Sequence, residues 1–76
     1  MIDTDLFPER LKKARAAKDW TQTKLAERAG VTKRIVVGYE QGARRPSLFN
    51  AALLAEALDV NLDWLAGRVK DANAKT

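Results

Sequence analysis

The sequence feature that most constrains the fold is a very short connection between two short helical patterns. Gly30 is a residue type that ends helices, and Thr32, only two positions later, is a type that begins them. Thr21 is a second helix-starting residue, so the pattern predicts helices over residues 22–29 and 33–40. Helices joined by a turn of roughly three or four residues cross steeply, at about 90–120°, and do not fold back as a long antiparallel pair. The sequence therefore predicts two short helices held at a steep angle.

The rest of the chain shows the signals of further short helices and only weak signals of β-strands. Pro8 suits the first turn of a helix that ends near residue 18, because the N–H group that proline lacks is not needed there. Ser47 and Asn61 are helix-starting residues, and they predict a fourth helix over residues 48–58 and a short fifth helix after it.

Apolar residues recur along these segments with the three-to-four spacing of a helix face that packs into a core. The expected core residues are Phe7, Leu11, Ala14, Leu25, Ala26, Ala29, Val31, Val36, Tyr39, Leu48, Ala51, Leu54, Ala55, Leu58, Leu62 and Leu65. Residues 69–76 hold almost nothing to bury, and we expect both them and residues 1–5 to be flexible. The sequence predicts one all-α domain over residues 6–68.

Composition excludes several classes of function. The chain has 76 residues, enough for one small domain, and it contains no Cys and no His. Disulfides, thiol nucleophiles, thiolate or imidazole metal sites and a His general base are therefore ruled out, and we expect a protein that is not an enzyme and uses no cofactor. No apolar run approaches the roughly 20 residues of a membrane span, and the acidic first residues do not resemble a signal peptide. These features favour a cytoplasmic protein.

Positive charge is concentrated in the middle of the chain. The net charge is +4, from 14 Lys and Arg residues against 10 Asp and Glu residues. Residues 10–46 hold eleven of the basic residues and three of the acidic ones, which is a local net charge of +8. This distribution favours a surface that binds a polyanion, although a basic surface kept for solubility has the same composition.

Three basic residues lie where helix physics disfavours them. Lys24, Lys33 and Arg34 fall in the first turns of expected helices, where the helix dipole opposes cations by roughly a few tenths of a kcal/mol each. Neither helix carries a Glu at its third position to complete a capping box. Local conflicts of this kind are expected at functional sites, and a phosphate backbone that faces these turns would supply the missing negative charge.

Several short motifs lie along the chain at matching offsets. They are Arg15; Thr21 and Gln22; Leu25-Ala26-Glu27-Arg28; Gly30-Val31-Thr32; Tyr39-Glu40-Gln41-Gly42; Arg45-Pro46-Ser47-Leu48; and Leu62-Asp63-Trp64-Leu65-Ala66-Gly67. Together they resemble the lambda-repressor-like (Cro/repressor, xenobiotic response element type) helix-turn-helix family over about residues 7–67. The resemblance implies a compact five-helix bundle that binds operator DNA, usually as a dimer, and regulates transcription. It also implies that Arg15 pairs with Glu40 and ties the third helix to the rest of the fold.

In this family the third helix reads DNA in the major groove. The resemblance makes Lys33 and Arg34 the best candidates to contact base edges, and Arg favours the O6/N7 edge of guanine. Val37 could pack on thymine methyl groups, and so could Ile35 unless it belongs to the core. Gly38 is also expected on the outward side, where it either permits close approach of the backbone or reduces the set of reading side chains.

The resemblance assigns further residues to the DNA backbone, namely Thr21, Gln22, Thr32, Gln41, Arg44 and Arg45. Contacts to phosphate give affinity and salt dependence but no sequence information. The Gln22 amide could also brace a side chain of the reading helix. Arg44 and Arg45 could instead enter a narrow minor groove, or be ordinary loop charge.

In many relatives the last two helices form the dimer contact. Phe49 and Trp64 are aromatic residues at expected outward or half-outward positions there. The resemblance implies an interface of Phe49, Val60, Leu62 and Trp64, although Trp64 could simply cap the core. A two-fold dimer would place two reading helices roughly 34 Å apart, one turn of DNA, and would recognise a palindrome.

These observations favour a sequence-specific regulator of transcription that binds double-stranded DNA. We expect a repressor or Cro-like protein that acts as a homodimer on a palindromic operator. One alternative is the antitoxin of a toxin–antitoxin pair, which represses its own operon and binds a protein toxin. The other is a helical protein-interaction module that reads no DNA. The basic segment 10–46 favours DNA over the module.

Overall fold

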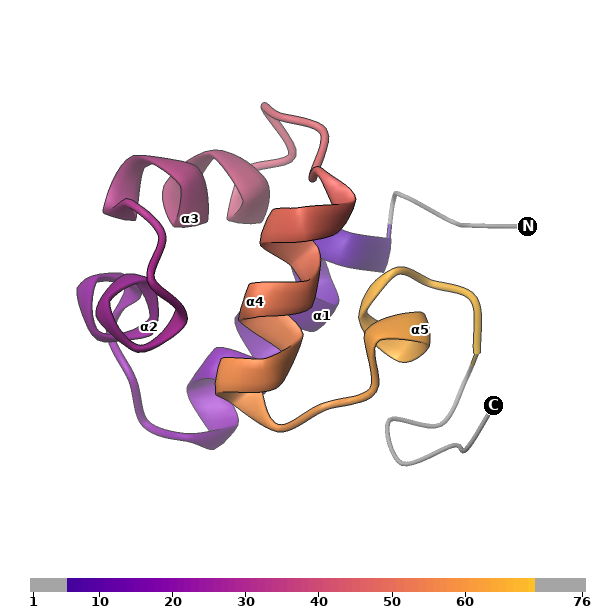
Figure 1. The fold of residues 1–76 in the computed structure, drawn as a ribbon, viewed down its shortest axis with the longest axis horizontal. Helices are drawn as coiled ribbons and strands as arrows, with labels where there is room; N and C mark the ends of the chain where they lie inside the picture. Colours follow the sequence, from indigo (N-terminus) through magenta and orange to yellow (C-terminus); the bar gives the residue numbers. More distant parts are fainter. Residues whose placement is uncertain (1–5, 70–76) are drawn as a thin grey trace.

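Five helices make up residues 6–69, the part of the chain that the computed structural model describes (Figure 1). They are α1 (Leu6–Ala17), α2 (Gln22–Ala29), α3 (Lys33–Glu40), α4 (Leu48–Leu58) and α5 (Leu62–Leu65). The described residues contain no strand, so the predicted all-α fold is confirmed. The expected flexible ends at residues 1–5 and 70–76 lie outside the described residues. Within residues 6–69, every helix is too short or too polar to cross a membrane.

The helix starts follow from local side-chain chemistry, as predicted. The side-chain oxygens of Thr21, Thr32, Ser47 and Asn61 accept hydrogen bonds of 3.0–3.2 Å from the backbone N–H group three residues further on. Each bond satisfies an amide group that the helix itself leaves without a partner, which is worth about 1 kcal/mol. The bounds of α2, α3 and α4 therefore agree with the predicted ones.

Each of the five helices is followed by a residue in the left-handed conformation. These residues are Asp19, Gly30, Gly42, Asp59 and Gly67, with φ between 57° and 84°. The residue after each one donates its N–H back across the helix end, as Val31 does to the carbonyl of Ala26 at 3.1 Å. This reversal at Gly30 leaves room for only two residues before α3 begins, which is why α2 and α3 meet at a steep angle.

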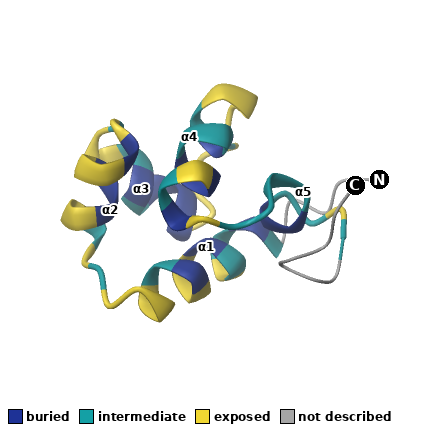
Figure 2. Cartoon of the chain, turned by 60° about the horizontal axis from the view of Figure 1, so that its bottom comes forward, coloured by how far each residue is buried: buried dark blue, intermediate teal, exposed yellow. Residues whose placement is uncertain are grey.

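The buried faces of the helices meet in one core (Figure 2). Figure 1 shows α1 and α4 in the middle of the molecule, with α2 and α3 on one side and α5 on the other. The largest fully buried side chains are those of Phe7, Leu11, Leu25, Val36, Leu54 and Leu65, all of them predicted core residues. Val31 and Leu62 are half-buried against the core, as is Val69, the first residue of the expected tail.

Leu48 does not belong to the core, so that prediction is wrong. Its side chain is 77% exposed, and that of the neighbouring Phe49 is 74% exposed. Both residues lie in the first turn of α4, which Figure 2 shows at the surface. Helical spacing identifies which face of a helix is buried, but it does not show how far along that face the neighbouring helices reach.

Tyr39 links the end of α3 to the start of α4. Its ring packs edge to face on Phe7, with the ring centres 5.6 Å apart. Its hydroxyl oxygen accepts hydrogen bonds from the Ser47 N–H and from the Asn50 side-chain amide, both at 3.2 Å. Because Ser47 caps α4 and Asn50 lies in its first turn, one buried side chain fixes these two helix ends against each other.

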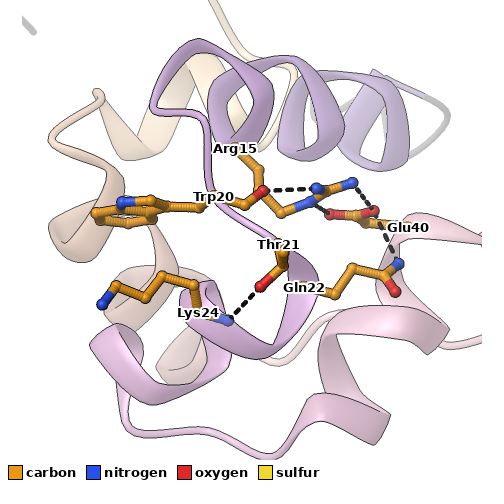
Figure 3. Close-up of polar contacts among 6 residues, drawn as sticks. All are labelled: Arg15, Trp20, Thr21, Gln22, Lys24 and Glu40. Carbon is orange, nitrogen blue, oxygen red and sulfur yellow. Dashed lines mark hydrogen bonds and ion pairs between the residues drawn. The ribbon is translucent and has the colours of Figure 1, made fainter.

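An ion pair between α1 and α3 holds the carboxyl end of α3 in place (Figure 3). Glu40 is only 4% exposed, and Arg15 donates from Nε and Nη2 to its two carboxylate oxygens at 2.6 and 2.9 Å. Gln22 donates its side-chain amide to the same carboxylate at 3.1 Å, and Arg15 Nη1 donates to the Trp20 carbonyl at 2.8 Å. The hydrogen bond with Glu40 raises the pKa of Arg15 above its ordinary value, against the opposing effect of burial. The predicted structural pair is confirmed.

Replacing Glu40 by glutamine tests how much this pair contributes to stability. Glu40→Gln should lower the free energy of unfolding by about 2–4 kcal/mol, because the amide leaves the Arg15 guanidinium without its charge partner. Urea unfolding followed by circular dichroism measures the change. Glu27→Gln, at an exposed position of α2, is the control and should change stability by less than about 0.5 kcal/mol. Equal unfolding midpoints for the two variants would show that the pair does not stabilise the fold.

Candidate nucleic-acid interface

The candidate interface is formed by the starts of α2 and α3. Figure 1 looks almost along α2 while α3 runs across the view, so the predicted steep crossing is confirmed. Leu25 and Ala26 of α2 and Val36 of α3 are buried in the shared core. These contacts leave the opposite side of α3 at the surface of the molecule.

The first turn of α3 presents two basic side chains to solvent. Lys33 and Arg34 are exposed, as predicted, and neither side chain forms an ion pair or a hydrogen bond with another residue of the described part of the chain. Ile35 and Val37 are half-buried, and Ile35 packs against the core. Ile35 therefore belongs partly to the core and partly to the surface, and two unpaired cations lie at the amino end of α3.

The residues predicted to contact the DNA backbone all reach the surface. Gln22 is half-buried and braces Glu40, as predicted, and the exposed residues are Thr21, Thr32, Gln41, Arg44 and Arg45. The oxygens of Thr21 and Thr32 cap the two helices as acceptors, which leaves each hydroxyl proton available to donate to a ligand. The two helix starts therefore offer hydrogen-bond donors beside positive charge.

Some of the basic residues in 10–46 contact aromatic rings or backbone carbonyl groups of the protein itself. The Arg10 guanidinium lies over the Trp64 ring, 5.0 Å from its centre, and donates to two backbone carbonyl groups near the end of the described chain. Lys18 and Arg28 lie over the Trp20 ring at 5.5 and 5.6 Å from its centre. The contacts of Arg10 and Arg28 were not predicted, because their aromatic partners are 54 and eight residues away in the sequence and such separations leave no local pattern.

The predicted outward positions of Gly38 and Trp64 are wrong. Gly38 is buried, because the side chain of Arg44 covers it. Trp64 is 7% exposed and packs in the core beneath Arg10. Both errors have the same cause. Arg44 lies in the loop after α3 and Arg10 lies in α1, so each covers a residue of a different element.

A second surface, at the start of α4, is apolar. It consists of Leu48 and Phe49, the two large hydrophobic side chains that are exposed within residues 6–69. Beside them lies a pocket of about 250 Å³, lined largely by Phe7, Pro46, Leu48, Ala51, Leu62 and Ala66. Phe49 was predicted as an interface residue and Leu48 was not, and the predicted residues Val60 and Leu62 are half-buried.

Comparison with known proteins identifies the family. The helix-turn-helix family matches residues 11–65. The HTH-type transcriptional regulator AnsR of Bacillus subtilis (strain 168) is 42% identical over 62 residues, which are 82% of this chain and 53% of AnsR. The chain spans about half the length of the curated relatives it matches.

Solved structures share the same arrangement of helices. The restriction-modification controller protein C.AhdI from Aeromonas hydrophila is 41% identical, with a TM-score of 0.75 over 78% of this chain and 89% of that one. The N-terminal DNA binding domain of SinR from Bacillus subtilis is 27% identical, with a TM-score of 0.77 over 92% of this chain and 97% of that one. The chain belongs to the Cro/C1-type helix-turn-helix family of DNA-binding transcriptional regulators.

Proposed function

We propose that this chain binds double-stranded DNA in a sequence-specific way through α3, and that it represses transcription as a homodimer on a palindromic operator. The observation that carries the proposal is the position of Lys33 and Arg34. They are exposed and unpaired among the described residues, at the amino end of a helix whose other end is held by a buried ion pair. The major groove of B-DNA admits an α-helix, so α3 can enter it from this rigid support.

The first turn of α3 supplies the base contacts in this proposal. Arg34 donates two hydrogen bonds to the O6/N7 edge of a guanine, and Lys33 contacts a neighbouring acceptor. The exposed parts of Ile35 and Val37 pack on thymine methyl groups. The operator is therefore expected to contain at least one guanine and one thymine in each half-site.

The helix starts and the loop after α3 supply the backbone contacts. The phosphates at the starts of α2 and α3 accept hydrogen bonds from Thr21, Gln22 and Thr32. Phosphates beyond the carboxyl end of α3 contact Gln41, Arg44 and Arg45. A phosphate at a helix start is stabilised by the helix dipole and by the nearby cations. It also removes the unfavourable effect of placing Lys24, Lys33 and Arg34 there.

The dimer contact is proposed for the apolar surface of Leu48 and Phe49. A two-fold axis places the same surface on both copies, so the Phe49 ring of one copy can enter the pocket beside Leu48 of the other. Leu62 lines that pocket and Val60 lies half-buried nearby in sequence, whereas Trp64 contributes from beneath as part of the core. Burial of two exposed large apolar side chains per copy favours association.

The apolar surface also bears on the alternatives. An antitoxin would bind DNA in the same way and use Leu48 and Phe49 to hold a protein toxin, and an interaction module would use only that surface. The basic first turns of α2 and α3 favour DNA binding over the module, because a protein partner at α4 does not require cations there. We expect the protein to act in the cytoplasm, on operator DNA.

Arg34→Ala tests the reading role of α3. The operator is first selected from a pool of random duplexes. The substitution should raise the Kd for the selected duplex by about 5–150-fold, equivalent to 1–3 kcal/mol, and leave the Kd for mixed-sequence DNA nearly unchanged. Fluorescence anisotropy at fixed salt measures both values. An equal loss on all sequences would refute the assignment of Arg34 as a base reader.

Arg45→Ala removes the same charge from the loop and should behave differently. We expect weaker binding to all sequences alike, and a slope of log K against log salt that is smaller by about one unit if one phosphate contact is lost. Titrations at several salt concentrations measure the slope. An unchanged slope would assign Arg45 to the solvated surface.

Phe49→Glu tests the dimer contact. The substitution places a charge in the apolar surface, so the variant should sediment as a monomer at concentrations where the wild-type chain is a dimer. Glu56→Gln, at an exposed position of the same helix, is the control and should leave sedimentation unchanged. A wild-type chain that remains monomeric both free and on DNA would contradict the proposed dimer.

A further inference from the structure

Gly38 is buried although it lies on the side of α3 that carries Arg34. Residues four apart on a helix share a face, so a side chain at position 38 would extend the row that Arg34 begins. The space for that side chain is occupied by Arg44. A methyl group on Gly38 would lie 2.8 Å from Arg44 Cδ, 3.1 Å from Cγ and 3.2 Å from Nε, which is too close for all three atoms to stay where they are.

The backbone after α3 brings Arg44 to this place. Gly42 adopts the left-handed conformation, with φ of 73°, and its N–H donates to the Tyr39 carbonyl at 3.3 Å. The Ala43 N–H then donates to the carbonyl of Gly38 itself at 3.0 Å. These two bonds turn the chain back over α3, so that the next residue, Arg44, lies across Gly38.

A second anchor holds the chain on the other side of Arg44. The Ser47 N–H donates to the Tyr39 hydroxyl oxygen at 3.2 Å, so residues 43 and 47 are both bonded to α3. Burial raises the pKa of the Tyr39 phenol, but hydrogen bonds from Asn50 and Ser47 together with the positive charge of Arg44 outweigh it, and the pKa is lowered. Arg44 therefore lies close enough to Tyr39 for its charge to favour the phenolate, although the hydrogen bonds from Asn50 and Ser47 have the larger effects.

We propose that Gly38 is a positioning residue, and that Arg44, held across it, supplies the DNA-contacting side chain for the turn of α3 that follows Arg34. The inference rests on the proposed function, since it concerns how α3 contacts DNA. Glycine lowers helix stability relative to alanine, and here its lack of a side chain provides the space in which the Arg44 stem lies. The guanidinium then presents paired donors, which fit either two phosphate oxygens or the O6/N7 edge of a guanine.

The consequence is that alanine at position 38 should affect DNA binding without harming the fold. The three atoms nearest to its methyl group all belong to the flexible part of the Arg44 side chain. Gly38→Ala should therefore unfold at the wild-type temperature or above it, because alanine is the better helix former. It should weaken binding to the selected duplex about as much as Arg44→Ala does, by about tenfold.

Four variants test this coupling by fluorescence anisotropy on the selected duplex. Because both single substitutions remove the same positioned guanidinium, Gly38→Ala combined with Arg44→Ala should bind no more weakly than Arg44→Ala alone. Gly38→Ala combined with Arg45→Ala is the matched control, in which the two losses should multiply. A loss on the selected duplex alone assigns Arg44 to a base edge, and a similar loss on mixed-sequence DNA assigns it to phosphate.

A measurement without DNA checks the position of Arg44 directly. Tyr39 is the only tyrosine in the chain, so the phenolate absorbance reports its pKa alone. Both Gly38→Ala and Arg44→Ala should raise that pKa relative to the wild-type chain, because each moves or removes the nearby positive charge. A structural role of Gly38 unrelated to Arg44 would not produce the same shift in both variants.

Three results overturn the proposal, and they distinguish its failure from that of the proposed function. If the wild-type chain binds a selected duplex and Gly38→Ala binds it equally well, or if the losses from Gly38→Ala and Arg44→Ala multiply, the positioning role of Gly38 is refuted and the proposed function stands. If the wild-type chain selects no duplex from the pool, both the proposed function and this inference fail.

Discussion

The position of α3 depends on the buried ion pair between Arg15 and Glu40. Glu40 lies at the carboxyl end of α3, where the helix dipole and the loss of solvent both disfavour a carboxylate. Two N–H groups of Arg15 and the amide of Gln22 supply hydrogen bonds to its two oxygens there. Because these three residues come from α1, α2 and α3, their hydrogen bonds tie the end of α3 to both neighbouring helices. Lys33 and Arg34 in the first turn of α3 can therefore stay exposed while the helix keeps its orientation.

The parts of the fold that depend on neighbouring residues could be predicted from the sequence. Thr32 caps α3 and Gly30 follows α2 because each needs only a local backbone geometry, so the bounds of both helices were correct. The spacing of apolar residues likewise identified the buried faces of the helices. Leu48 was misplaced because its exposure depends on where other helices end, and a helical pattern carries no information about that distance.

The candidate site also combines features that depend on neighbouring residues with features that depend on distant ones. Exposure of Lys33 and Arg34 followed from their place opposite Val36, whereas the burial of Gly38 depends on a side chain from the following loop. Trp64 is covered by Arg10, 54 residues away in the sequence, and this contact has no local signal. The number of basic residues in the middle segment therefore overstates how many unengaged cations a ligand meets, since Arg10 and Arg15 are bonded to other parts of the fold.

Tyr39 joins α3 to the apolar surface of α4 as one rigid unit. Its hydroxyl accepts hydrogen bonds from Ser47, which directly precedes Leu48 and Phe49, and from Asn50, which directly follows them. A second copy bound to that surface would therefore hold both α3 helices at one fixed separation. The contact between the two copies then sets the separation of the two DNA half-sites, because each α3 is rigidly linked to that contact. An inserted or deleted base pair between half-sites would have to be accommodated by bending or twisting the duplex, and the elastic energy of DNA would become part of the discrimination.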